Sequence, residues 1–389
     1  MIPSGASAFV GLAPVVLAVF LGFLALSVPL GALSLELGGN LGFGTFVVGL
    51  VIGLQSLATL STRHQAGTLC DQGGPRKAIL IGLPLAASSG VAYVLSSVLP
   101  LGVEGKLAFM VAGRLSMGLG ESLFLTGLMS LGIARLGADR TGRVMSWTGI
   151  AIYAALGLGA PFGLTAQGAY GFLAVGLITC LTPILALAII VRLPPAPAVG
   201  GQRVPIHHVL GLIWRPGLVL ALSMVPFAVM AAFLPLHYAA RGWSQAGIAL
   251  FGFAAAYVLV RLVGPGLPVR FGATRIAVGS LAFELAGQAL LWLAPSPNIA
   301  AMGAILTGLG FSLVFPAMGV LATRSVPPDQ RGRAVGNFMA FADIALGVTG
   351  PAVGLATQWA GLSAAFIVGA AATGAALLLI PLIKLRTAP

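Results

Sequence analysis

The sequence repeats one stretch, in which Gly118-Leu119-Gly120, Gly142-Arg143, Gly157 and Pro161 return as Gly308-Leu309-Gly310, Gly332-Arg333, Gly347 and Pro351. Each residue of the second copy lies 190 positions after its counterpart in the first. A constant displacement over such a length, without a gap, indicates two copies of one structural unit. We therefore expect a chain built from two similar halves.

The composition excludes a water-soluble globular protein. Of the 389 residues, 58% are hydrophobic and only 7% are charged, whereas a soluble domain carries about a quarter charged residues. The net charge of +12 would also suit a nucleic-acid binder, but such a protein needs its basic residues gathered on one face. Here Lys and Arg are dispersed between apolar runs, so we expect a lipid bilayer around the chain and no nucleic-acid partner.

Twelve apolar segments approach the length of about 20 residues that a helix needs to cross a bilayer. They cover residues 8–34, 43–62, 78–100, 107–134, 144–167, 170–192, 217–239, 244–264, 276–294, 298–322, 334–357 and 362–383. Helices satisfy their own backbone hydrogen bonds in lipid. The sequence therefore predicts an all-α membrane protein with twelve transmembrane helices in two pseudo-symmetric six-helix bundles.

The distribution of basic residues predicts the orientation of the chain. With both termini in the cytoplasm, 17 of the 20 Lys and Arg residues fall on the inner side, leaving Lys106 and Arg241 outside and Arg114 within a helix. The positive-inside rule favours this topology over its inverse. The first apolar run is too long for a cleaved signal peptide, so we interpret it as a permanent helix.

Proline and paired glycines mark the longest polar interval, which we interpret as a cytoplasmic linker over 193–216 between bundles 1–192 and 217–389. Its His207-His208 pair has no third ligand nearby, so we expect no metal site and no cofactor. Duplicated membrane blocks are typical of secondary transporters, which bind substrate between the repeats. We expect a small-molecule substrate in that position.

The segment from Gly67 to Lys77, with Asp71, Gly74 and Arg76 between them, resembles the loop signature of the major facilitator superfamily. Asp71 is suited to cap the start of the following helix, and the glycines permit a tight turn. The resemblance implies a cytoplasmic gate. We assign it the residues Gly67, Asp71, Gly74, Arg76, Lys77, Arg143 and Arg333.

A second resemblance lies in the fourth apolar segment, where Arg114, Gly118 and Gly120 match a pattern that the same family associates with proton coupling in its antiporters. Glu121 follows Arg114 by seven residues, on the same helix face. An arginine within lipid is costly and should face an acid or a polar cavity. A structural ion pair and a coupling role both remain open.

The segment from Gly157 to Gly163 looks like the family's antiporter signature with one residue inserted, and the copy around Gly347 and Pro351 fits better. Small residues let helices approach closely and proline permits bending. We expect Gly157, Pro161, Gly347 and Pro351 to act as hinges, with simple helix packing as the alternative. The combined motifs are similar to a bacterial arabinose-efflux-like branch that includes drug–proton antiporters and exporters of opine-type metallophores.

Four acids lie in or beside apolar segments, namely Glu36, Glu121, Glu284 and Asp343. We expect Glu36 to reach water and Glu284 to have an interhelical partner. Glu121 and Asp343 lie near mid-depth, so we expect them, with Arg114, to carry proton coupling, and we favour Glu121. Gln55, Trp147, Tyr153 and Asn337 are candidates for lining the substrate cavity.

The sequence thus predicts a proton-coupled exporter of a small or amphiphilic solute, such as a drug, a sugar or a metallophore, acting by alternating access as a monomer in the bacterial inner membrane. A proton-linked or facilitative importer is the alternative on the same scaffold. A lipid flippase or a membrane enzyme is a different class. We expect no enzyme, because the four histidines are scattered and no phosphate-binding loop is present.

Overall fold

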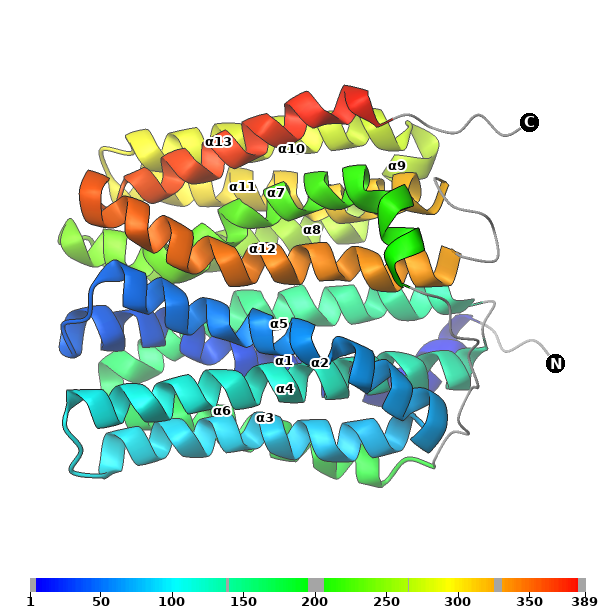
Figure 1. Ribbon diagram of the computed structural model, residues 1–389, viewed down its shortest axis with the longest axis horizontal. Helices are drawn as coiled ribbons and strands as arrows, with labels where there is room; N and C mark the ends of the chain where they lie inside the picture. Colours follow the sequence, from blue (N-terminus) through cyan, green and yellow to red (C-terminus); the bar gives the residue numbers. More distant parts are fainter. Residues whose placement is uncertain (1–4, 138–139, 195–205, 265, 325–330, 384–389) are drawn as a thin grey trace. The chain divides into compact units, whose positions relative to one another are not determined.

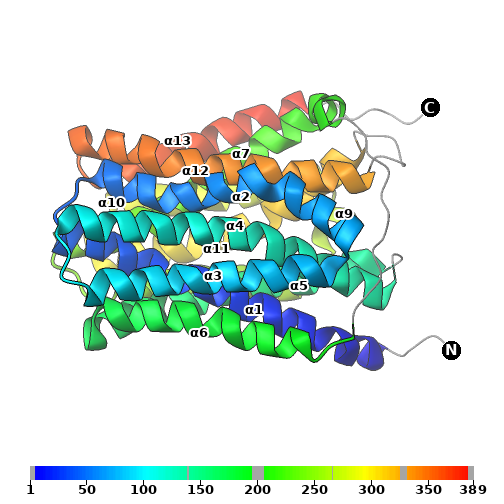
Figure 2. The same cartoon turned by 60° about the horizontal axis from the view of Figure 1, so that its bottom comes forward.

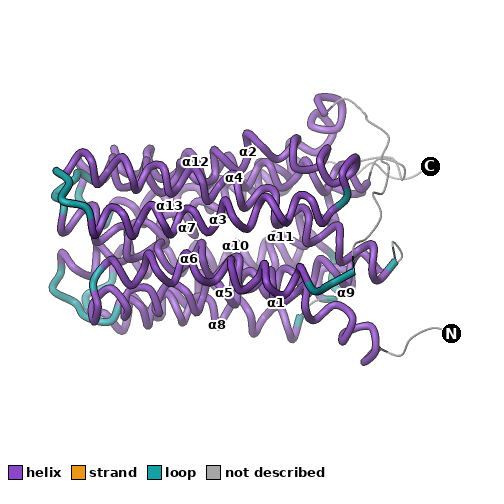
Figure 3. The backbone as a smooth tube through the Cα atoms, turned by 90° about the horizontal axis from the view of Figure 1, so that it is seen from below, coloured by secondary structure: helices purple, strands orange, loops and turns teal. Residues whose placement is uncertain are grey.

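The computed structural model describes residues 5–137, 140–194, 206–264, 266–324 and 331–383, and over these ranges the regular structure is helical (Figure 3). Within them, twelve helices are long and apolar enough to cross a membrane. The predicted all-α fold with twelve spans is therefore confirmed. The chain forms two compact units, residues 1–36 with 54–202 and residues 37–53 with 203–389.

The first unit contains five complete helices and residues 54–73 of α2. They are α1 (Gly5–Leu35), α2 (Thr45–Gly73), α3 (Pro75–Val98), α4 (Val103–Leu136), α5 (Thr141–Tyr170) and α6 (Phe172–Val191). Helix α3 lies between α4 and α6 (Figure 2), and α1 packs on α5 and α6. A short π-helical turn, Glu36–Asn40, follows α1.

The second unit contains residues 45–53 of α2 and the remaining helices. These are α7 (Ile206–Ala240), α8 (Ala246–Val263), the short α9 (Leu267–Arg270), α10 (Ala273–Leu293), α11 (Pro297–Arg324), α12 (Arg331–Ala360) and α13 (Ala364–Leu379), with a final 3-10 turn at Ile380–Leu382. Helix α10 packs on α11 and α13, and α7 packs on α12 and α13 (Figure 1).

The helix pairs of the first unit recur in the second. The contacts of α3 with α4 and α6 correspond to those of α10 with α11 and α13, and the contacts of α1 with α5 and α6 correspond to those of α7 with α12 and α13. The turns correspond as well, since Gly74 and Gly272 precede α3 and α10 with φ angles of 80° and 92°. Only glycine adopts such a backbone without strain. The repeated glycines of the sequence therefore mark repeated architecture.

The boundaries of α2 and α3 differ from the prediction. Helix α2 continues eleven residues beyond position 62 and ends at Gly73, so Gly67 and Asp71 are helical residues. The N-cap of α3 is Gly74, without a side-chain hydrogen bond, and Asp71 is exposed on α2. The expected capping by Asp71 is wrong, because one glycine with a positive φ makes the whole turn.

Helix α7 begins at Ile206, eleven residues before the predicted segment, so part of the interval interpreted as a linker is helical. Pro216 lies inside α7. Of the rest of that interval, residues 195–205 lie outside the described part of the chain. His207 and His208 belong to the first turns of α7.

Candidate functional site

Glu121, near the middle of α4, accepts two hydrogen bonds from α2. The Gln55 Nε2 atom lies 2.9 Å from the Glu121 Oε2 atom, and the Thr59 hydroxyl lies 3.1 Å from the same oxygen. Gln55 and Thr59 are four residues apart and therefore share one face of α2. Both are buried, while Glu121 is half-buried. The result is a carboxylate held by two neutral donors.

Gly118 and Gly120 allow two helices to approach α4 from different sides. A Cβ atom at Gly118 would overlap the Gln55 carbonyl oxygen of α2, and one at Gly120 would lie 2.7 Å from the Gly82 carbonyl oxygen of α3. Small residues at both crossings bring the helix backbones together. This close approach places the donors of α2 next to Glu121.

Arg114 is buried in α4, with 2% of its surface exposed. Tyr93 of α3 and Glu121 both lie within its electrostatic reach. The Tyr93 ring also packs against Gly113 and contacts the Phe172 ring at a centroid distance of 5.7 Å. Arg114 and Glu121 thus share one electrostatic environment, while hydrogen bonds to Glu121 come from α2.

The other three acids differ in their surroundings. Glu36 is half-buried and accepts a hydrogen bond of 3.2 Å from the Gln167 side chain of α5. Asp343 of α12 is 8% exposed and belongs to the second unit. Glu284 of α10 is fully buried, and neither of its carboxylate oxygens has a hydrogen-bond partner among the described residues. The expected interhelical partner of Glu284 is therefore absent among the described residues.

The predicted cavity residues occupy α2, α5 and α12. Gln55 contacts Glu121 directly, and Trp147 and Tyr153 are half-buried on α5. Asn337 belongs to α12, but its side chain lies outside the described part. The displacement of 190 positions relates Tyr153 to Asp343 and Trp147 to Asn337. The candidates on α5 and α12 therefore occupy equivalent repeat positions.

The predicted gate residues lie at one end of their helices. Arg76, at the start of α3, donates a hydrogen bond of 2.9 Å to the Val191 carbonyl oxygen at the end of α6. Lys77 and Arg143 are exposed. Arg333 lies in the first turn of α12, with its side chain outside the described part. The hydrogen bond of Arg76 thus links the start of α3 to the end of α6.

The predicted hinge segments contain glycines that face different helices. On α5, Cβ atoms at Gly159 and Gly163 would overlap Ser27 and Val28 of α1. On α12, a Cβ atom at Gly350 would overlap Gly49 of α2, and the Thr45 hydroxyl donates a 2.8 Å hydrogen bond to the Gly354 carbonyl oxygen. Gly157, Pro161, Gly347 and Pro351 all lie within these helices.

Sequence reasoning missed two parts of this arrangement. Thr59 was not singled out, although its spacing of four from Gln55 could have indicated it. The contact of α2 with α12 through Gly49 and Gly53 was also missed. Its signal is the separation of those glycines by three residues, which is the small-xxx-small pattern of closely packed membrane helices.

The fold and these motifs agree with what similar proteins show. The model of the Major Facilitator Superfamily matches residues 15–267 and 244–389. The chain belongs to this family. An "uncharacterized MFS-type transporter" of Salmonella typhimurium is 38% identical over 354 residues, covering 91% of both chains. One of Burkholderia mallei is 37% identical over 390 residues, covering 100% of this chain and 96% of the relative.

Solved structures of the Major Facilitator Superfamily share the fold. The nucleoside transporter NupG superposes with a TM-score of 0.75 at 14% identity, covering 96% of this chain and 99% of NupG. A D-xylose–proton symporter gives a TM-score of 0.74 at 15% identity, with 97% of each chain covered. At such identities the likeness concerns the fold alone.

Membership of this superfamily makes the chain a secondary transporter and not an enzyme. Its bacterial relatives and its twelve apolar helices indicate a multi-pass protein of the inner membrane. A small-molecule substrate is consistent with this class.

Proposed function

We propose that this transporter is a proton-coupled exporter of a small or amphiphilic solute and that Glu121 carries the proton. We also propose that the transporter belongs to the arabinose-efflux-like branch, which includes drug and metallophore exporters. The proposal also includes cytoplasmic termini, bundles 1–192 and 217–389 that alternate access as units, and a single chain as the functional form.

One observation carries the assignment of Glu121. The displacement of 198 positions that relates Gly74 to Gly272 also relates Gln55 to Phe253 and Thr59 to Tyr257, while the displacement of 190 relates Glu121 to Phe311. In the second unit, the Phe311 ring contacts the other two rings, with centroid distances of 5.8 Å to Phe253 and to Tyr257.

The fold therefore accommodates an aromatic cluster at the positions where the first unit has a carboxylate and two donors. Burying polar groups in place of an aromatic cluster costs free energy unless they are hydrogen-bonded. A polar cluster that the fold does not require supports a function for Glu121, because ionisable residues within membrane helices mark ion and substrate pathways.

The chemistry of the cluster suits reversible protonation. The ionised carboxylate accepts hydrogen bonds from Gln55 and Thr59 and interacts with Arg114. Protonation removes the charge that Arg114 and the two donors stabilise. A cationic or polar solute near Glu121 would compete with the proton for the ionised form. The proton and the solute would then cross the membrane in opposite directions.

Asp343 is the second acid of the proposal, because it is buried at a repeat position equivalent to Tyr153. Gln55, Trp147, Tyr153 and Asn337 are proposed to contact the solute. The segment from Gly67 to Lys77, with Arg143 and Arg333, is proposed as the cytoplasmic gate, and Gly157, Pro161, Gly347 and Pro351 as the hinges.

Everted membrane vesicles test the proposal. Respiration acidifies their lumen, and an entrapped pH-sensitive dye reports proton release when arabinose, a cationic dye or an opine-type chelator is added. An exporter coupled to protons releases luminal protons, whereas a proton-linked importer does not respond in this direction. The solute that gives the response in the wild type is then used with the variants.

Glu121→Gln should abolish the proton response while proton-independent exchange of the same solute persists. Glu36→Gln is the matched control, because Glu36 is also half-buried in the first unit and also accepts from a glutamine side chain, at 3.2 Å. This control should keep the response. An undiminished proton response in Glu121→Gln would remove Glu121 from the mechanism.

A further inference from the structure

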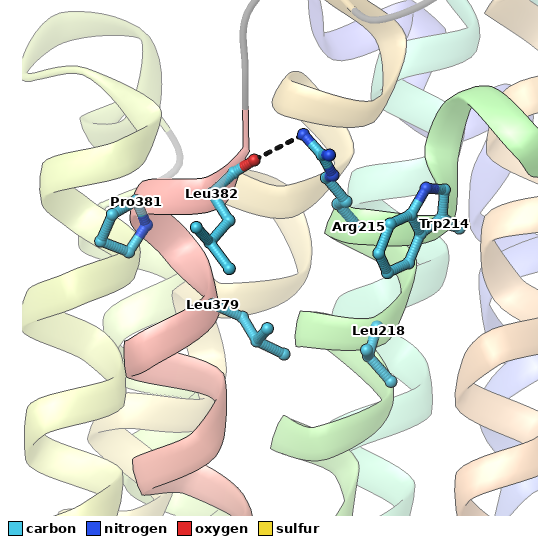
Figure 4. Close-up of a pocket in the computed structure, with 6 residues that line it drawn as sticks. All are labelled: Trp214, Arg215, Leu218, Leu379, Pro381 and Leu382. Atoms are coloured by element: carbon cyan, nitrogen blue, oxygen red, sulfur yellow. Dashed lines mark hydrogen bonds between the residues drawn. The ribbon is translucent and has the colours of Figure 1, made fainter.

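A small pocket lies on the second unit, where the start of α7 meets the end of α13. It has a volume of about 210 Å³. Figure 4 shows its six lining residues, which are Trp214, Arg215, Leu218, Leu379, Pro381 and Leu382. The pocket thus combines one cation and one indole ring with apolar walls.

Arg215 is fixed at the mouth of this pocket. Its Nη1 atom donates a hydrogen bond of 2.7 Å to the Leu382 carbonyl oxygen (Figure 4), and its Cζ atom lies 5.4 Å from the centre of the Trp214 ring. No carboxylate forms an ion pair with Arg215 in the ranges that the structure describes. A positioned guanidinium with one donor used keeps further N–H donors for an anion.

We place the pocket near one surface of the membrane. The last apolar span ends at Leu382, and on α7, which begins at Ile206, the charged Arg215 follows Trp214. Tryptophan is enriched at membrane–water interfaces, and Trp214 is 47% exposed. Leu218 and Leu379 lie further inside these spans, at the level of lipid chains. The order from polar mouth to apolar wall matches the order from headgroup to acyl chain.

We propose that this pocket binds an anionic phospholipid, with the headgroup phosphate on Arg215 and an acyl chain along Leu218 and Leu379. Charge complementarity favours an anionic over a zwitterionic lipid, since basic pockets between helices at the cytoplasmic surface bind anionic headgroups. None of the pocket's six lining residues belongs to the proposed proton pathway.

Native mass spectrometry of the purified full-length protein measures the binding of phosphatidylglycerol and of phosphatidylcholine with the same acyl chains. The wild type should retain phosphatidylglycerol preferentially. Arg215→Gln should weaken its binding about fivefold, the contribution of one basic residue near an anionic lipid surface. Trp214→Leu, a second variant in case Arg215→Gln fails to fold, should also weaken it.

Arg241→Gln is the matched control at the opposite end of α7. Arg241 also lies over a tryptophan ring, at 5.0 Å from Trp243, and also donates to a carbonyl oxygen, that of Ala294 at 2.8 Å. This variant should bind phosphatidylglycerol like the wild type. Circular dichroism and size-exclusion chromatography establish that each variant is folded.

Three results would overturn the proposal. Equal retention of the two lipids would show that the headgroup charge is not recognised. Equal losses in Arg215→Gln and Arg241→Gln would show non-specific attraction to basic residues. Displacement of phosphatidylglycerol by inorganic phosphate at similar concentration would identify a site for the free anion instead of the lipid.

Discussion

Replacing Glu284 with methionine should make the protein more stable. Glu284 is fully buried at the crossing of α10 and α11, and both of its carboxylate oxygens lack a hydrogen-bond partner within the described residues. Gly310 of α11 packs against the backbone and the Cβ atom of Glu284. Methionine has a similar length and can fill the same space without a polar group.

The expected rise in the free energy of unfolding follows from the desolvation of the Glu284 carboxyl group. A buried polar group without a partner costs ~1–3 kcal/mol, and more when it is charged. Glu284→Met removes that cost while it keeps the apolar contacts of the side chain. We therefore expect the free energy of unfolding to rise by ~1–3 kcal/mol. Glu284→Gln should give no such gain, because the amide leaves polar atoms in the same place.

The duplicated fold offers the reciprocal experiment. Ala86 lies 198 positions before Glu284 and is fully buried at the crossing of α3 and α4, where a Cβ atom at Gly120 would lie 2.6 Å from the Ala86 nitrogen. Ala86→Glu should lower the free energy of unfolding by at least ~1–3 kcal/mol, because it adds an unpartnered acid and overfills the crossing.

Unfolding of the purified protein in mixed detergent micelles, followed by circular dichroism, measures these differences at one pH. Solute transport measured in parallel separates stability from function. A lower stability of Glu284→Met, with Glu284→Gln unchanged, would show that the carboxyl group makes a favourable hydrogen bond. That result would refute the reasoning.

Two further substitutions test the contacts of α2. Thr59→Val should lower proton-driven transport roughly tenfold, since a hydrogen bond to a charged group contributes ~1.5–3 kcal/mol, whereas Thr62→Val removes a hydroxyl that does not contact Glu121 and should have little effect. Gly49→Ala would overlap a carbonyl oxygen of α12 and should lower the free energy of unfolding by ~1–3 kcal/mol. Gly39→Ala meets no neighbouring atom within 4 Å and serves as its control. Equal effects of either substitution and its control would contradict these assignments.

The fold was predictable because lipid leaves a chain few choices. Apolar runs of bilayer length must be helical, and the constant displacement between the glycine motifs indicated the duplication. The ends of the helices were harder to predict. Helix α2 continues through polar residues to Gly73, since hydropathy reports where lipid ends and not where the helix ends.

The candidate site was predictable only in part. Spacing placed Arg114 and Glu121 on one helix face, and their electrostatic interaction agrees with it. The partner of Glu121 on α2 depends on the rotation of that helix, which the close approach at Gly118 sets. Glu284 shows the same limit, because helical spacing alone could not indicate whether a neighbouring helix offers it a donor.

Comparison of the two repeats separates what the fold needs from what chemistry adds. Both copies keep a glycine where α4 crosses α3 and where α11 crosses α10, namely Gly120 and Gly310, so this residue serves packing. The copies differ at three positions. Glu121, Gln55 and Thr59 of the first copy correspond to Phe311, Phe253 and Tyr257 of the second. Because the two sets fill equivalent crossings, packing alone does not explain the polar set. Under the proposed function, the polar set carries the proton, and the aromatic set fills the equivalent space in the other copy.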